Sequence, residues 1–111
     1  MSGNMNDLLK QAGRMRKDME KVADELRQRY VEADAGGNLV KVVFNGQQEM
    51  VKISLDEKLV KPDGGGNVDL AMLEDLIVAA VSKGLEESKA LMKAEMDKAT
   101  GGLSSSLPGL F

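Results

Sequence analysis

Four cationic side chains recur at helical spacing near the start of the chain. This basic stripe consists of Lys10, Arg14, Lys17 and Lys21. Steps of four, three and four residues place them on one side of an α-helix, where they could contact a row of phosphates. The opposite side of that helix is an apolar seam, at the spacing by which two helices bury a common face. The seam consists of Met1, Met5, Leu8, Ala12, Met15, Met19, Val22 and Leu26.

The residues alone leave two interpretations of the stripe and two of the seam. Asp18, Glu20 and Glu25 follow three of the stripe's cations by three or four positions. At that spacing the charges are more typical of a solvated face with intrahelical ion pairs than of a binding site. The seam predicts a core contact, and its partner is either a second helix or the same helix of a second subunit.

Further cations are weaker candidates for the same chemistry. Arg16 lies nearer the edge of the seam. Lys83, Lys89 and Lys93 lie on a second predicted helix, where acidic side chains surround them. The sequence therefore favours the first helix as the cationic surface.

The composition argues against an enzyme. The chain has no cysteine and no histidine, which removes disulfides, thiolate nucleophiles, most zinc sites and the commonest general base near neutral pH. We therefore expect no catalytic residue, metal site, cofactor or small-molecule substrate. The longest apolar run, residues 76–81, is far shorter than the ~20 residues that cross a bilayer. A cytoplasmic protein without a membrane partner is the expectation.

Positive charge is concentrated near the start of the chain. The net charge is -3, yet residues 1–30 carry seven Lys/Arg against five Asp/Glu. A surface for an anionic partner should therefore lie near the first helix. The aromatic residues are only one tyrosine and two phenylalanines, which disfavours recognition of single strands or RNA by base stacking.

Periodicity predicts a single α+β domain over residues 1–99. A first helix should begin near Asn4 or Asn6 and end near Arg29. It contains Gly13 beside the seam, where a missing side chain would permit close approach. Alternating apolar residues then predict a three-stranded antiparallel meander. Its strands are Tyr30 to Ala35, one that buries Val40, Val42 and Phe44, and one that buries Val51, Ile53 and Leu55.

The connections and the second helix follow from glycine and apolar patterns. Asn45-Gly46 predicts a type I′ hairpin turn, and residues 56–66 predict a plain loop because they lack the pattern of a phosphate-binding loop. A second long helix should run from about Asp69 to Ala99. Residues 70–81 should be buried because they are apolar nearly all round, and Gly84 should mark a bend or a helix crossing.

Residues 100–111 predict a flexible C-terminal tail, because they are rich in glycine and serine and show no usable period. Their apolar residues would also suit a docking motif. These are Leu107, Leu110 and Phe111.

Four short segments together resemble the YbaB/EbfC family. They are Leu8 to Ala12, Gly37 to Val42 with Asn45-Gly46, Met72 to Ala80, and Leu107 to Gly109. The resemblance implies a small bacterial nucleoid-associated protein that is not an enzyme and binds duplex DNA with little sequence preference. It also implies a tweezer-like homodimer, whose helical arms project from a central sheet. Gly13 to Asp18 departs from the family's commoner pattern by adding cations.

The resemblance reverses the choice for the basic stripe. We expect Lys10, Arg14, Lys17 and Lys21 to contact phosphates, with Arg16, Lys89 and Lys93 as secondary DNA-binding residues, in a protein located at the nucleoid. The alternative is a non-enzymatic protein-interaction module that does not bind DNA, in which the cations only keep the chain soluble. The acidic net charge favours that alternative.

Overall fold

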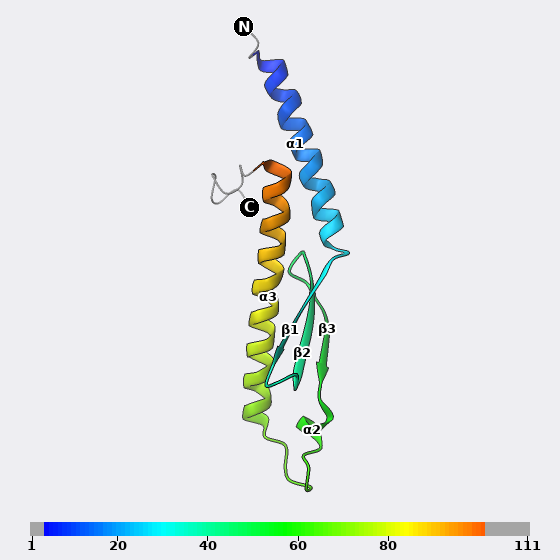
Figure 1. Cartoon of the computed structure of the whole chain (residues 1–111), viewed down its shortest axis with the longest axis vertical. Coiled ribbons are helices and arrows are strands. Elements are labelled where there is room, and N and C mark those ends of the chain that lie inside the picture. Colours follow the sequence, from blue (N-terminus) through cyan, green and yellow to red (C-terminus); the bar gives the residue numbers. More distant parts are fainter. Residues whose placement is uncertain (1–3, 102–111) are drawn as a thin grey trace.

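The computed structural model describes residues 4–101 as an elongated α+β fold that measures 79 × 23 × 16 Å along its principal axes (Figure 1). The elements are α1 (Met5–Leu26), β1 (Tyr30–Ala35), β2 (Val40–Asn45), β3 (Met50–Leu55), α2 (Glu57–Val60) and α3 (Leu70–Thr100). Two long helices and a three-stranded antiparallel sheet are thus confirmed. Met1 of the seam and residues 102–111 of the predicted tail lie outside the described residues.

Helix α1 begins where the sequence predicts. The side chain of Asn4 caps it by accepting a hydrogen bond from the backbone N–H of Asp7 at 2.9 Å. It ends at Leu26 rather than near Arg29. The reason is tertiary, since the Leu26 carbonyl accepts a hydrogen bond from the N–H of Gly46 at 2.8 Å while the chain turns toward β1.

Helix α3 covers one face of the sheet and forms the core with it. The strands lie in the order β1-β2-β3, and α3 runs along β1 and β2 (Figure 1). Val40 and Val42 of β2 are fully buried, and Ala80 of α3 packs in the same cluster. Helix α2, which the sequence analysis missed within the predicted loop, adds the buried Leu59 to this core.

The predicted type I′ turn is wrong, although the hairpin itself forms. Neither Asn45 nor Gly46 has a positive φ; the positive φ falls on Gln48, at 62°. The Asn45 side chain organises the longer turn, because its Oδ1 accepts hydrogen bonds from the N–H groups of Gln47 at 2.9 Å and Glu49 at 3.2 Å. A glycine is needed at position 46 because the turn packs closely against the end of α1: a Cβ there would lie 2.7 Å from Cδ2 of Leu26.

The β2–β3 turn, residues 45–49, joins α1 and α3 to the sheet. Besides the Gly46 bond to α1, the side chain of Gln47 donates to the carbonyl of Ala23 at 2.8 Å. On the other side, the buried Ser88 of α3 donates to the carbonyl of Asn45 at 2.6 Å and accepts from the N–H of Gln48 at 2.9 Å. The turn therefore fixes how the two long helices lie relative to each other.

Strand β3 does not bury the face that the sequence predicts. Val51, Ile53 and Leu55 are 51%, 41% and 43% exposed. Ile53 pairs with Val42 and Leu55 with Val40, so these two share the core side of the sheet, but α3 lies mainly over β1 and β2 and does not cover them. The ladder also shifts register beside Phe44, which pairs with Met50.

The start of α3 is less buried than its apolar composition predicts. Leu70, Met72 and Val78 are 64%, 43% and 65% exposed. The sheet covers only one side of the helix, so the apolar residues on its other sides remain in solvent. Gly84 does not interrupt α3, and the element that approaches it closely is strand β2 rather than another helix.

The seam of α1 has two parts. Its C-terminal part packs against the end of α3, with Leu26 buried and Met15, Met19 and Val22 partly buried. Its N-terminal part is exposed: Met5 is 68% and Leu8 55% exposed, and Ala12 is exposed as well. The second helix of the same chain is thus one partner of the seam, and it reaches only half of it.

Two glycine-to-alanine changes should have opposite effects. At Gly84 a Cβ would lie 2.7 Å from the ring of Phe44, so Gly84→Ala should lower the free energy of unfolding by about 1–3 kcal/mol. At Gly13 no atom of the described residues lies within 4 Å of an added Cβ, so α3 does not make the predicted close approach there. Gly13→Ala should therefore stabilise α1, by up to about 1 kcal/mol. Denaturant unfolding followed by circular dichroism measures both; a Gly84→Ala protein as stable as the parent would contradict this packing.

Candidate functional site

The basic stripe lies on the outward side of α1. At 3.6 residues per turn, Lys10, Arg14, Lys17 and Lys21 fall within about 60° of one another and opposite the seam. All four are exposed. Because the seam side of α1 faces α3, the stripe lies on the side of α1 away from α3, and only Lys21 at its inner end also lines the cleft between the two helices.

None of the stripe's cations forms an ion pair within residues 4–101. The intrahelical pairs on α1 involve other residues, since Arg16 lies 3.9 Å from Glu20 and Arg27 lies 2.7 Å from Asp24. Asp18 and Glu25 do not neutralise the stripe at this range. Its four charges are therefore available to an external anion.

Arg16 is set apart from the stripe. It lies toward the seam, and its Nε is 3.9 Å from Glu20 Oε1, with both side chains more than two-thirds exposed. An exposed pair at this distance contributes roughly 0–1 kcal/mol, so it restrains Arg16 only weakly.

The lysines of α3 do not extend the stripe. Lys89 and Lys93 are exposed and form no ion pair in the part of the chain that the structure describes, but they lie on the helix from which the stripe points away. Lys83 is engaged differently, because its Nζ donates to the carbonyl of Asp34 at 2.7 Å. This contact attaches α3 to β1.

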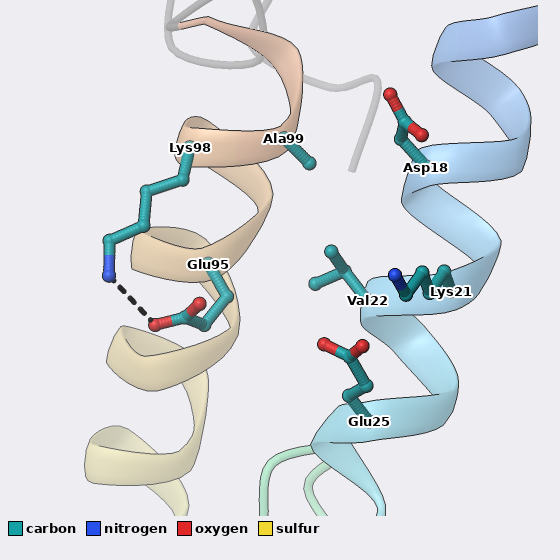
Figure 2. Close-up of a pocket in the computed structure, with 7 residues that line it drawn as sticks. All are labelled: Asp18, Lys21, Val22, Glu25, Glu95, Lys98 and Ala99. Atoms are coloured by element: carbon teal, nitrogen blue, oxygen red, sulfur yellow. Dashed lines mark hydrogen bonds and ion pairs between the residues drawn. The ribbon is translucent and has the colours of Figure 1, made fainter.

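A cleft of about 350 Å³ separates the ends of α1 and α3 (Figure 2). Lys21 lies on its rim, at the inner end of the stripe. The other lining residues are Asp18, Val22, Glu25, Glu95, Lys98 and Ala99. Three carboxylates against two ammonium groups make the cleft a poor site for an anion. An anionic partner should therefore contact the outer surface of α1 rather than enter this cleft.

Glu95 of α3 forms an ion pair with Arg29, in the segment between α1 and β1, and another with Lys98 of its own helix. Its Oε1 lies 3.0 Å from Nη1 of Arg29 and 3.2 Å from Nζ of Lys98. Hydrogen bonds from Lys98 and then from Arg29 lower the pKa of Glu95 below its ordinary value. Sequence reasoning missed the Arg29 contact, because a pair so distant along the chain leaves no local periodic signal.

No metal or membrane feature adds to the site. Among residues 4–101, no three His, Cys, Asp or Glu side chains gather closely enough to hold a metal ion. No helix in the same range is long and apolar enough to span a bilayer.

Known proteins are similar to this chain in sequence over nearly its whole length. Residues 1–103 match the YbaB/EbfC DNA-binding family. A nucleoid-associated protein of Acetivibrio thermocellus is 45% identical over 109 residues, which cover 98% of this chain and 91% of that protein. One from Desulforamulus reducens is 45% identical over 111 residues, covering 100% of this chain and 99% of the relative.

The fold also matches a solved structure. An uncharacterized protein from Helicobacter pylori superimposes with a TM-score of 0.70 at 21% identity, over 91% of this chain and 98% of the other. At this identity the likeness supports the fold alone.

The lowered pKa of Glu95 predicts a pH-dependent contribution to stability. A carboxyl with a depressed folded-state pKa stabilises the fold fully above its unfolded-state pKa, and the contribution is lost as the pH falls through the folded-state value. Glu95→Gln should therefore be less stable than the parent near neutral pH, and the difference should shrink in acid. Urea unfolding at a series of pH values measures it. Glu86→Gln, at an exposed position of α3, is the control, and an equal pH dependence for both variants would refute the assignment.

Proposed function

Because the chain belongs to the YbaB/EbfC DNA-binding family, we propose that it binds duplex DNA as a nucleoid-associated protein, with little sequence preference. Phosphate contacts from the basic stripe provide most of the affinity. The observation that carries this proposal is the exposure of Lys10, Arg14, Lys17 and Lys21 on one face of α1, free of ion pairs within the described residues.

The geometry of the stripe suits a backbone rather than a base-reading surface. From Lys10 to Lys21 it extends about 16 Å at a rise of 1.5 Å per residue. Cations at several points along this length can each displace a counterion from neighbouring phosphates. Such contacts give affinity without sequence discrimination. Of the described aromatic residues, Phe44 is buried in the core and Tyr30 lies on β1, so neither extends the stripe with a stacking platform.

The negative charge outside the first helix should orient the protein as it approaches DNA. With a net charge of -3 and a cationic first helix, the rest of the surface repels phosphate while α1 attracts it. The resulting field favours approach with the outward side of α1 facing the duplex. The total charge is therefore compatible with DNA binding, provided that the contact stays local.

The uncovered side of β3 is the surface that we assign to a homodimer. Ile53 and Leu55 face the same side of the sheet as the buried Val42 and Val40, yet they are 41% and 43% exposed. A chain of 111 residues buries a modest core alone, and a second copy related by two-fold symmetry would cover both apolar surfaces at once. Two copies also present two basic stripes to one duplex.

Replacing the stripe should abolish DNA binding. The variant with glutamine at Lys10, Arg14, Lys17 and Lys21 should no longer retard duplex DNA in a gel. In fluorescence anisotropy across a salt series, the parent should show a slope of log K against log salt of about -3.6 for each chain that binds, from four phosphate contacts at about -0.9 each. The variant should lose most of that slope.

A matched control carries the same change in charge elsewhere. Glutamine at Lys41, Lys52, Lys58 and Lys61 also removes four exposed positive charges, from the sheet, α2 and the residue after it. This control should keep most of the affinity of the parent. Equal losses in both variants would mean that overall charge, and not the stripe, governs binding.

Disrupting the β3 surface should produce a monomer. The parent should have a mass in light scattering of about twice 11.9 kDa. Ile53→Glu with Leu55→Glu should have the monomer mass with an unchanged helical circular dichroism spectrum, because both side chains are already partly exposed in one chain. Lys52→Glu, on the alternate side of the same strand, is the control and should stay dimeric. A dimer that persists in the double variant would place the interface elsewhere.

A further inference from the structure

The N-terminal end of α1 extends past the end of α3. Figure 2 shows Ala99, near the C-terminal end of α3, at the level of Asp18 on α1. The part of α1 before Asp18 continues for about 20 Å at 1.5 Å per residue and has no neighbouring element among the described residues (Figure 1). Every residue from Asn4 to Ala12 is exposed. We call residues 5–12 the distal end of α1.

The distal end keeps an apolar face without a cover. Met5 is 68% and Leu8 55% exposed, whereas Leu26, on the same seam beside the β2–β3 turn, is 1% exposed. A helical segment this short is marginal in water without packing on its apolar side. The seam therefore continues beyond the point where its partner α3 stops.

The chain continues beyond the end of α3 with a segment that could cover this apolar face. Residues 102–111 follow directly from Gly101, the C-cap of α3, and read Gly-Leu-Ser-Ser-Ser-Leu-Pro-Gly-Leu-Phe. They contain no charged side chain and include four large apolar ones: Leu103, Leu107, Leu110 and Phe111. Ten residues extend to about 33 Å, which exceeds the ~20 Å from the end of α3 to Met5.

We propose that residues 103–111 pack on the apolar face of the distal end of α1, formed by Met5, Leu8 and Ala12. A tether of this length holds the segment at an effective concentration in the millimolar range. A copy outside the proposed dimer would have to reach a comparable concentration to compete through an equally weak contact. We therefore favour the tail over a second copy as the occupant. In this arrangement α3 covers the C-terminal part of the seam, and the segment that follows α3 covers the N-terminal part.

The contact goes beyond the proposed function and does not compete with it. Lys10 and Arg14 lie on the opposite side of α1 from Leu8 and Ala12. A tail on the seam side leaves these cations open, and its side chains add no charge. Its effect is to keep the distal end helical, so that the outer half of the basic stripe is presented on an ordered support.

A spin label on the tail tests the contact in the full-length protein. The chain has no cysteine, so Ser105→Cys provides one attachment site for a nitroxide. Apart from the residues next to the label in sequence, relaxation broadening should be strongest for the amide signals of residues 5–12. Lys58→Cys, on α2 at the other end of the fold, is the matched control and should leave these signals sharp. Broadening confined to the end of α3, or spread evenly over the molecule, would overturn the proposal.

A mixed sample separates the tail from a second copy. When ¹⁴N protein labelled through Ser105→Cys is mixed with unlabelled ¹⁵N protein, the signals of residues 5–12 should stay sharp. Broadening in the mixture as strong as in the singly prepared sample would show that the tail of another copy occupies the seam, which contradicts the proposal.

Removal of the apolar side chains tests the consequence for α1. In Leu107→Ser with Leu110→Ser, amide hydrogen exchange of residues 8–12 should be about tenfold faster than in the parent, while exchange in the sheet stays unchanged. Ser104→Ala with Ser106→Ala keeps the apolar residues and should exchange like the parent. Exchange at residues 8–12 that does not respond to loss of the two leucines would overturn the proposal.

Discussion

The hydrogen bonds between Ser88 and the β2–β3 turn determine how the long elements of this fold are arranged. The Ser88 hydroxyl is buried, donates to the carbonyl of Asn45 and accepts from the N–H of Gln48. A buried polar group left without a partner costs about 1–3 kcal/mol, so the three groups stabilise one position of the turn on α3. The same turn binds the last carbonyls of α1 through Gly46 and Gln47. The direction of α1, and with it the direction of the basic stripe, follows from this contact.

Helix α3 covers only part of the apolar surface of the sheet and of α1, so some apolar residues are buried and others remain exposed. Where α3 lies over β1 and β2, Val40 and Val42 are fully buried. On β3 the paired residues Leu55 and Ile53 have the same orientation and remain exposed. The seam of α1 shows the same division along its length. The limited reach of α3, a helix of 31 residues, therefore explains why apolar surface remains on β3 and on the N-terminal part of α1.

Local patterns in the sequence predicted the helices and strands. The turn type and the ion pairs depend on contacts between distant segments, which local patterns do not reveal. Spacing alone located both long helices, and Asn4 was a recognisable cap. Asn45-Gly46 predicted a hairpin correctly and its turn type wrongly, because the Asn45 side chain and the proximity of Leu26 determine the turn. The contact of Arg29 with Glu95 has no periodic signal. The stripe could be found as a set of residues, but its freedom from ion pairs depends on side-chain geometry that spacing does not specify.

Among the described residues, only the C-terminal part of α1 contacts the rest of the fold, and its N-terminal part projects beyond α3. Lys21 lies in the C-terminal part of α1, which the β2–β3 turn and α3 hold in place. Lys10 lies about 16 Å farther along the helix. A tilt of about 10° at the C-terminal end of α1 displaces Lys10 by about 3 Å, comparable to the ~3.4 Å rise per base pair along one DNA strand, and scarcely moves Lys21. In the proposed complex, the inner cation would keep its position while the outer cations shift by about one phosphate spacing. The helix would then reach phosphates at slightly different positions without any change in its own conformation.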